Sequence, residues 1–310
     1  MSPTTGTPGA NTAIVGARAA RAAAQAKVNL RLRVLSREQS GYHQIETVFQ
    51  RLDLADEVTV RTGVAGRSID CTGDVMPDVG LGAPEQNLAF RAAEAYREAA
   101  GWPDGFAIEI VKRVPVGGGL GGGSADAGTV LRILEALAPR PMGVRVLELA
   151  ARLGADVPFM TTETPLAFAW GRGERMLGLT PLPRRRVQLV VPPFGVSTAE
   201  AYRWLADSRP PYELAGALLP AAALLSWTEV AEVAENDLAA PVEKRHPEVA
   251  AYRRALERGG AEIAMLAGSG STVFGVFDEG VRGLVAGDVE GGRLIETRTA
   301  AHVVPIRPIE

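Results

Sequence analysis

Polar and apolar residues alternate from Lys27 to Leu35, and this is the first regular pattern in the chain. Successive side chains of a strand point to opposite faces, so the segment predicts a half-buried β-strand. Its apolar residues are expected to face a core: Val28, Leu30, Leu32 and Val34. Its polar residues share the other face: Lys27, Asn29, Arg31 and Arg33. After a turn at Ser40-Gly41, residues 45–60 predict more strand, with a break near Asp53.

The next segments predict a helix, a strand and a second helix around a glycine-rich stretch. Asn87 is a suitable N-cap and Gly101 a suitable C-terminal stop, so a helix is expected over residues 88–100. Residues 106–111 predict a short strand that runs directly into the glycines. From Ser124, a suitable cap, an amphipathic helix is expected with its apolar stripe at Val130, Leu131, Leu134 and Leu137. Prolines 139 and 141 end it, and another helix is predicted over residues 144–153.

The pattern changes after residue 158, and we place a domain boundary near residue 168. Strand and turn are predicted over residues 168–173, further strands over 187–191 and 272–277, and mostly helix over 199–258. Strands and helices do not alternate strictly, which favours an α+β fold over a doubly wound sheet. The predicted organisation is a disordered extension over residues 1–25, an N-terminal domain over 26–168 and a C-terminal domain over 169–310.

Composition is typical of a globular protein. The chain has 310 residues, of which 46% are hydrophobic and 22% charged, and this length suits two domains or one large one. The net charge of -3 does not favour a nucleic-acid surface, and no apolar run is long enough to cross a bilayer. Cys71 is the only cysteine, which excludes an internal disulfide and favours a reducing cytoplasm.

The first 25 residues are rich in Thr, Ala, Gly and Arg and contain no acidic residue. They lack the continuous apolar segment of a secretory signal, so we exclude that interpretation. A disordered bacterial extension is favoured. An organellar transit peptide, which is also rich in Arg and poor in acidic residues, stays open as the alternative.

The strongest candidate for chemistry is the segment Pro115-Val116-Gly117-Gly118-Gly119-Leu120-Gly121-Gly122-Gly123-Ser124. Glycine permits positive φ and lets a ligand approach the main chain. The helix that follows offers unpaired N–H groups and the positive end of its dipole, so the segment predicts a phosphate cradle. It is no Walker A loop, because no Gly-Lys-Ser or Gly-Lys-Thr ends it, and its spacing does not fit a dinucleotide fingerprint. A plain linker is disfavoured between a strand and an amphipathic helix.

Residues 115–127 resemble the phosphate-binding motif of the GHMP kinases, a family that includes the galactose, homoserine and mevalonate kinases. Residues 26–30 with 41–43, and residues 153–159, resemble the branch of that family that phosphorylates a cytidine diphosphate-linked methylerythritol. Residues 197–202, 236–238 and 268–274 extend the likeness, which covers roughly residues 26–280. The resemblance implies a two-domain fold, with a ribosomal protein S5-like N-terminal domain and an α/β C-terminal domain. It also implies transfer of the γ-phosphate of ATP to a hydroxyl in the non-mevalonate isoprenoid pathway.

The resemblance assigns catalytic and nucleotide-binding roles. Asp156 matches the catalytic aspartate, which accepts the proton of the attacking hydroxyl, and Lys27 matches the active-site lysine. The Lys27 charge is expected to keep Asp156 ionised and to stabilise the nucleophilic oxygen. Lys112 is expected to approach the nucleotide, whose phosphates lie against Pro115, Val116, Gly117, Gly118, Gly119, Leu120, Gly121, Gly122, Gly123 and Ser124. Mg²⁺ is expected to arrive with ATP, and no dedicated metal-ligand cluster is predicted.

Substrate recognition is assigned in the same way. By resemblance, His43 hydrogen-bonds the cytosine edge and Tyr42 offers an aromatic face, with Tyr202 on the opposite side. Asn29 shares a strand face with Lys27 and is expected to help orient the substrate. Backbone donors near the substrate phosphates are expected from Gly268, Ser269 and Gly270. The alternative to substrate binding for Tyr42-His43 is a turn beside a strand. For residues 268–270 the alternative is a plain tight turn before a strand.

Two positions depart from the family pattern. Ala125 and Ala267 stand where serines are common, so any hydroxyl role there is in doubt, although the backbone donors remain. Two other functions stay open: another GHMP kinase acting on homoserine or mevalonate derivatives, and a non-catalytic nucleotide-binding regulator on the same fold. The pair Tyr42-His43 argues against the first, and Lys27 with Asp156 against the second. We expect a cytoplasmic protein that is a monomer or weak homodimer and binds a small-molecule substrate, with no nucleic-acid or membrane partner.

Overall fold

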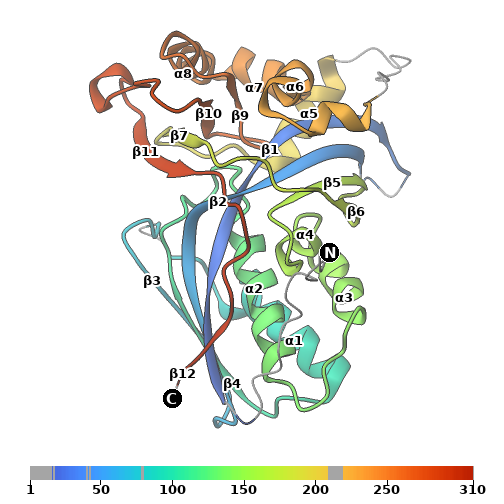
Figure 1. Ribbon diagram of the computed structural model, residues 1–310. Coiled ribbons are helices and arrows are strands. Elements are labelled where there is room, and N and C mark those ends of the chain that lie inside the picture. Colours follow the sequence, from blue (N-terminus) through green and yellow to red (C-terminus); the bar gives the residue numbers. More distant parts are fainter. Residues whose placement is uncertain are drawn as a thin grey trace, which may run out of the picture.

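Figure 1 shows the computed structural model, which describes residues 16, 18–39, 41, 43–77, 80–208 and 219–309. Within these residues the strands form an eight-stranded and a four-stranded sheet. The larger sheet contains β1 (Ala19–Arg37), β2 (His43–Thr62), β3 (Arg67–Thr72), β4 (Phe106–Val111), β5 (Leu166–Gly171), β6 (Arg175–Gly178), β8 (Glu235–Asn236) and β12 (Arg307–Ile309). The smaller contains β7 (Arg186–Val191), β9 (Ile263–Leu266), β10 (Val273–Phe277) and β11 (Arg293–Arg298).

The α-helices fall into two groups, one in each half of the molecule (Figure 1). The first group is α1 (Leu88–Ala100), α2 (Gly122–Leu137), α3 (Arg145–Leu153) and α4 (Val157–Thr161). The second is α5 (Thr198–Ser208), α6 (Trp227–Val233), α7 (Ala239–Arg245) and α8 (Pro247–Arg258). Three short 3₁₀ helices accompany them among the described residues: Pro84–Gln86, Ala221–Leu224 and Ala286–Asp288. Mixed sheets with helices grouped by half confirm the predicted α+β class.

The antiparallel strands β1 and β2 extend through both halves of the molecule. Their pairing jumps from Gln25 opposite Ala55 to Lys27 opposite Arg51, so three residues of β2 have no partner in β1. Leu52, one of these three, bridges to Thr299 instead. The predicted break near Asp53 is therefore a bulge inside one continuous strand, which bends β2 without ending it.

Strand β1 is buried on both faces, which corrects the prediction of a half-buried strand. Val28 and Leu30 lie in the core as expected, but Lys27 and Asn29 on the polar face are each only 3% exposed. The glycine-rich segment covers this polar face, since the Lys27 ammonium donates to the Gly119 carbonyl over 3.1 Å. The alternation predicted the strand correctly, but the cover on its polar face comes from residues almost a hundred positions away.

Most predicted helix boundaries are confirmed, with one correction at the glycines. The Asn87 side chain caps α1 by accepting from the Ala89 amide, and Gly101 ends it with φ of 66°. Helix α2 begins at Gly122, however, with Gly121 as its N-cap and no side-chain cap hydrogen bond. Ser124 therefore lies inside the first turn and is not the predicted cap, because Gly121 can take the left-handed conformation that turns the chain into the helix.

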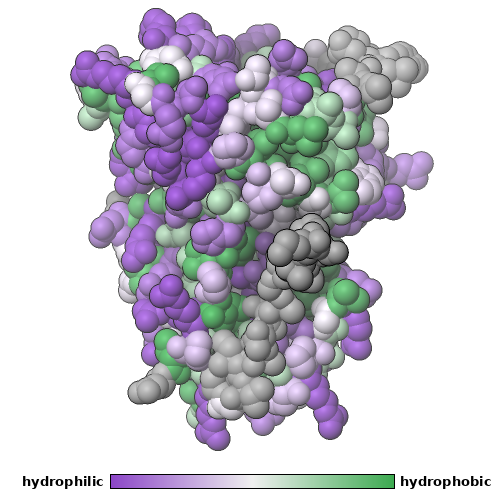
Figure 2. Space-filling model, viewed as in Figure 1, coloured by the Kyte–Doolittle hydropathy of each residue, from purple (hydrophilic) through white to green (hydrophobic). Residues whose placement is uncertain are grey.

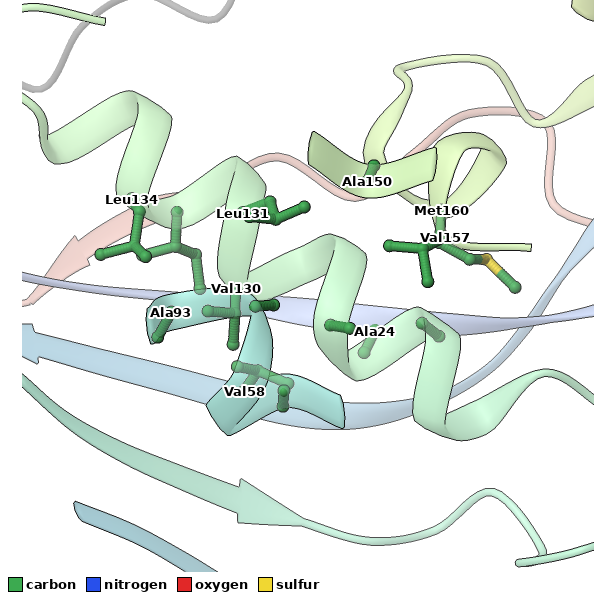
Figure 3. Close-up of a cluster of buried hydrophobic side chains, with 14 of the residues drawn as sticks. Ala24, Val58, Ala93, Val130, Leu131, Leu134, Ala150, Val157 and Met160 are labelled. Atoms are coloured by element: carbon green, nitrogen blue, oxygen red, sulfur yellow. The ribbon is translucent and has the colours of Figure 1, made fainter. Parts of the chain in front are cut away.

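Helix α2 lies at the centre of the N-terminal core (Figure 3). Val130, Leu131 and Leu134 on this helix contact apolar residues of β1, β2 and the other N-terminal helices, including Ala24 and Val58. Burial of such side chains stabilises a fold by about 25 cal/mol per Å² of apolar area. This packing fixes the start of α2, and with it the glycine-rich segment, against the sheet.

The two halves of the molecule share two apolar clusters. Val28 and Leu30 of β1 belong to the same buried cluster as Leu189 of β7 and Phe274 of β10. Farther along β1, Leu32 and Val34 belong to another cluster that includes Leu238, Val249 and other buried residues of the C-terminal half. Hydrophilic residues cover much of the face seen in Figure 2, with smaller apolar groups between them. These shared clusters place the functional residues of the two halves on a common support.

The predicted domain limits differ from the strands in three places. Residues 19–25 belong to β1, so the expectation of disorder up to residue 25 is wrong for them, while residues 1–15 and 17 lie outside the described part. Strand β5 crosses the proposed boundary at residue 168 and pairs with β2. Strand β12, near the chain end, returns to pair with Ala19–Arg21 of β1. Sheet pairing between distant segments produces these differences, and no local composition signals them.

Candidate active site

The glycine-rich segment leaves its backbone amides unbonded. The first bonded amide of α2 is that of Ala125, which donates to the Gly121 carbonyl over 2.8 Å. Within the described part of the chain, no acceptor is hydrogen-bonded to the N–H groups of residues 117–124. The start of a helix with free N–H groups and a positive dipole end is a favourable site for an anion. Free donors are therefore present where the sequence predicts a phosphate cradle.

Gly119 packs against the turn at residues 267–270, called here the second glycine turn, without room for a side chain. Its φ is 78°, and a Cβ atom there would lie 2.0 Å from the Ala267 carbonyl oxygen. A Cβ atom on Gly118 would lie 2.5 Å from Oγ1 of Thr272. The glycine-rich segment of one half and the turn of the other thus meet backbone to backbone. Because the Ala267 carbonyl makes this contact, the serine that is common at that position is not needed for it.

Lys27 and Asp156 lie together, as the resemblance implied. The Lys27 ammonium donates to Asn29 Oδ1 over 2.8 Å and to the Gly119 carbonyl over 3.1 Å, and it lies 3.4 Å from Asp156 Oδ2. An ammonium group has three donors, so these acceptors hold it in one position. The lysine therefore connects the glycine-rich segment to the carboxylate.

Asn29 is held by a second hydrogen bond that fixes its orientation. Its amide nitrogen donates to Thr47 Oγ1 over 2.8 Å, and the Thr47 hydroxyl donates to the Arg31 carbonyl over 2.7 Å. With the nitrogen engaged in this way, the Asn29 oxygen must face Lys27. The sequence placed Asn29 beside Lys27, but it did not identify Thr47, which comes from the neighbouring strand β2.

Asp156 occupies the position before α4 without capping that helix. Its side chain makes no cap hydrogen bond and is 27% exposed, whereas the Lys27 side chain is 4% exposed. A helix-end aspartate normally binds the first amides of its helix. Here the carboxylate instead faces the buried Lys27 ammonium and lines a cavity.

Two cavities adjoin the glycine-rich segment. The larger, of about 1030 Å³, is lined by most of the predicted substrate residues. Lys27, Asn29 and Asp156 line it together with His43, Tyr202, Gly268 and Ser269. Tyr42 lies outside the described residues. Gly270 does not line the cavity, and its amide donates to the Ala267 carbonyl over 2.8 Å, so it shapes the turn and is not a free donor.

His43 and Tyr202 stack on one wall of this cavity. Their ring centroids are 4.5 Å apart with an interplanar angle of 27°. Burial and the nearby Arg37 charge lower the pKa of His43 below its ordinary value. The imidazole therefore stays neutral near pH 7, with one ring nitrogen as donor and the other as acceptor. Burial and the Asp156 carboxylate raise the pKa of Tyr202, so its hydroxyl remains protonated.

The glycine-rich segment also lines a smaller cavity of about 360 Å³. Residues 114–124 line this cavity together with Asn87 and Gln86. Gly119, Gly121 and Ser124 line both cavities. A ligand in the small cavity and a ligand in the large one would therefore meet at the start of α2, close to Lys27 and Asp156.

Lys112 lines the small cavity, but its ammonium group is largely used by protein. It is 3% exposed and pairs with Asp56 and with Asp126, the latter over 2.7 Å. Burial lowers the pKa of Lys112, but the carboxylates of Asp126 and Asp56 outweigh this effect and raise it above the ordinary value. The sequence suggested direct approach to a nucleotide, and it did not identify either aspartate.

Three further residues of the site were not found from the sequence. Asn236 donates to the Gly268 carbonyl over 2.8 Å and so supports the second glycine turn. Arg37 and Thr198 line the larger cavity. The block of residues 236–238 was part of the family resemblance, and this was the one available signal for Asn236.

Comparison with known proteins gives two family matches. Residues 87–163 match the N-terminal domain of the GHMP kinases, and residues 218–289 match the C-terminal domain of the same family. Among the described residues, no helix is long and apolar enough to span a bilayer.

Similar proteins and structures extend over nearly the whole chain. A Pelotomaculum thermopropionicum protein named 4-diphosphocytidyl-2-C-methyl-D-erythritol kinase is 39% identical over 282 residues, 89% of this chain and 92% of its own length. One of the same name from Citrifermentans bemidjiense is 39% identical over 82% of this chain and 88% of its own. A crystal structure of 4-(cytidine 5'-diphospho)-2C-methyl-D-erythritol kinase has a TM-score of 0.72 at 35% identity, covering 90% of this chain and 99% of that one. Cytophaga hutchinsonii homoserine kinase shares the fold, with a TM-score of 0.66 at 15% identity over 94% and 98% of the two chains.

Proposed function

Because this chain belongs to the GHMP kinases, and within them to the 4-diphosphocytidyl-2-C-methyl-D-erythritol kinases, we propose that it transfers the γ-phosphate of ATP to a hydroxyl of 4-diphosphocytidyl-2-C-methyl-D-erythritol. The products are the 2-phosphate and ADP. One observation carries the proposal: the Lys27–Asp156 pair lines the larger cavity, and the Lys27 ammonium bonds the carbonyl of Gly119, a residue of the glycine-rich segment that lines both cavities.

The smaller cavity is the proposed ATP site. The triphosphate lies against residues 117–124, where the amides of Gly122, Gly123 and Ser124 belong to the unbonded first turn of α2. Positioning and charge stabilisation account for most of the catalysis of phosphoryl transfer, so fixed backbone donors suit this reaction. The γ-phosphate would then extend past Gly119 toward the larger cavity.

The larger cavity is the proposed site of the acceptor. Its hydroxyl approaches Asp156, which accepts the proton as the oxygen attacks phosphorus. The Lys27 ammonium, held by Asn29 and Gly119, stabilises the negative charge that develops on that oxygen. The cytosine base would replace the stacking contact between the His43 and Tyr202 rings. Its edge would then meet His43, a neutral donor and acceptor, and its face would stack on the Tyr202 ring.

The residues present fit Mg²⁺ that arrives with the nucleotide. No group of three His, Cys, Asp or Glu side chains among the described residues could hold a metal ion by itself. Ser124 lines both cavities, and its hydroxyl oxygen is the kind of ligand that Mg²⁺ accepts beside phosphate oxygens and water. When bound, the ion would neutralise charge on the transferring phosphate.

We also infer a cytoplasmic enzyme, active as a monomer or weak homodimer on a small-molecule substrate.

The direct test of this function is a kinase assay that follows ADP release. The purified protein is offered ATP with 4-diphosphocytidyl-2-C-methyl-D-erythritol, and separately with homoserine and with mevalonate. We expect turnover with the first acceptor and none with the others. Turnover with homoserine or mevalonate alone would replace the proposed acceptor, and ATP binding without turnover of any acceptor would favour a regulator.

Removing the Tyr202 ring should weaken binding of the acceptor without stopping the reaction. Stacking of an aromatic ring on a base contributes about 1–3 kcal/mol, so Tyr202→Leu is expected to raise KM for the acceptor by about 5-fold to 150-fold, with kcat nearly unchanged. Tyr202→Phe is the matched control, because it keeps the ring and should keep KM near that of the wild type. Equal KM values for all three proteins would remove Tyr202 from the recognition site.

The Thr47 hydroxyl should affect turnover through Lys27. Thr47→Val keeps the shape but leaves the buried Asn29 amide without its acceptor, at a cost of about 1–3 kcal/mol. We expect kcat to fall by about tenfold with KM for ATP unchanged. Thr129→Val is the control, because Thr129 is also fully buried and its hydroxyl has no hydrogen-bond partner within the described residues. If both substitutions lowered kcat equally, the effect would come from packing and not from Asn29.

A further inference from the structure

Asp56, Lys112 and Asp126 form a buried ionic cluster directly beneath the glycine-rich segment. The Lys112 ammonium bonds Asp56 Oδ2 on one side and Asp126 Oδ2 on the other. The side chains are 0%, 3% and 6% exposed for Asp56, Lys112 and Asp126. Asp56 comes from β2 and Asp126 from α2, and Lys112 directly follows β4, so the cluster joins three separate elements.

The cluster holds both ends of the glycine-rich segment. On the entering side, Asp56 Oδ1 accepts hydrogen bonds from the amides of Arg113 at 2.5 Å and Val114 at 2.8 Å. On the leaving side, Asp126 lies in α2 just beyond the free first turn. Lys112 connects these two carboxylates. The ends of the segment are thereby fixed relative to each other before any ligand binds, which reduces the ordering cost of binding.

The charges of the cluster do not suit a direct phosphate ligand. One cation serves two carboxylates, and Asp126 Oδ1 has no hydrogen-bond partner within the described part of the chain. Burial raises the pKa of Asp126, against the opposing effect of Lys112. A lysine whose charge is balanced in this way contributes little attraction for a triphosphate, but it contributes a strong geometric link.

We propose that Asp56, Lys112 and Asp126 are positioning residues for the nucleotide, which set the shape of the glycine-rich segment by linking its two ends. Lys112 acts through the backbone of residues 113–124 and not as a ligand of the phosphates. This inference rests on the proposed function, because it assumes that the segment binds ATP. It assigns two aspartates to the ATP site that the sequence patterns left aside.

The test removes the bond between Lys112 and Asp126 of α2, while the positive charge of Lys112 stays balanced by Asp56. In Asp126→Ala, Lys112 keeps its pair with Asp56, and alanine suits a helix interior. We expect kcat/KM for ATP to fall on the order of 10²-fold, with KM for the acceptor unchanged, because the donors of the segment are misplaced. Binding of a non-hydrolysable ATP analogue, measured by titration calorimetry on the full chain, should weaken in parallel. In Asp126→Asn the acceptor for Lys112 returns, and most of the ATP affinity should return with it.

The opposite change in ATP affinity would indicate the alternative role of Lys112, direct contact with the phosphates. If Lys112 contacted the phosphates directly, Asp126→Ala would free the donor that now bonds Asp126, remove a nearby carboxylate and tighten ATP binding. That result would overturn the proposal. Glu163→Ala is the control for general damage to α2, because Glu163 pairs with buried Arg132 of the same helix at 2.9 Å. If it weakened ATP binding as much as Asp126→Ala, the proposal would also fail.

Failure of the proposed function gives a different pattern. A wild-type protein that binds the ATP analogue but phosphorylates no acceptor would contradict the kinase assignment, while the order of analogue affinities among the variants would still test the positioning role. A wild-type protein that binds no ATP analogue would contradict both proposals at once.

Discussion

Replacing Asp156 with alanine is expected to remove turnover while ATP still binds almost as in the wild type. A general base contributes on the order of 10²–10⁴ in rate, so kcat should fall by at least that range. The Asp156 carboxylate lines the acceptor cavity, whereas the unbonded amides that are proposed to hold the triphosphate belong to residues 117–124. The loss should therefore appear in kcat and not in the affinity for ATP.

The Asp156 experiment needs two measurements and a control substitution at another aspartate of the same cavity. Single-turnover ADP release gives the chemical step, and calorimetric titration with a non-hydrolysable ATP analogue gives the affinity. Asp207 also lines the acceptor cavity, but it comes from α5, and Asp207→Ala should keep turnover. Unchanged turnover in Asp156→Ala would refute the assignment of this residue as the base, whatever the result with Asp207.

The second large effect is expected at Gly119. Any other residue at this position must adopt a left-handed backbone conformation, which costs about 1–2 kcal/mol. Its Cβ atom would also lie 2.0 Å from the Ala267 carbonyl oxygen, which must therefore move. Displacing packed backbone adds about 1–3 kcal/mol. Gly119→Ala should therefore lower the free energy of unfolding by about 2–5 kcal/mol and abolish detectable ATP binding, because the segment must move away from Lys27.

Two other glycines of the same segment separate the causes of this effect. Gly123 has open space and no positive φ, so Gly123→Ala should be tolerated. Gly117 has open space and φ of 75°, so Gly117→Ala should show the conformational cost alone, about 1–2 kcal/mol. Thermal unfolding and analogue titration of the three variants provide the ranking. If Gly119→Ala were no worse than Gly117→Ala, close contact with Ala267 would not constrain the loop.

Local sequence patterns predicted the elements that carry the site. Asn87 and Gly101 marked the ends of α1, and the apolar stripe predicted α2, because caps and helical periodicity depend only on nearby residues. The start of α2 was misplaced at Ser124, because a glycine in the left-handed conformation can begin a helix without any side-chain signal. The break expected near Asp53 was a bulge, whose bridge to Thr299 depends on residues far along the chain.

The sequence by itself determined the α+β class, the glycine-rich segment with its helix, and, through the family motifs, the pairing of Lys27 with Asp156. These features follow from local periodicity, from backbone freedom and from motifs that are contiguous in the chain. Only the tertiary structure decided that Lys112 is shared by Asp56 and Asp126, that Thr47 orients Asn29 and that Ala267 lies against Gly119. The reason is physical: hydrogen bonds, ion pairs and backbone contacts between distant segments form only when strand register and packing bring those segments together, and no single stretch of residues encodes that meeting.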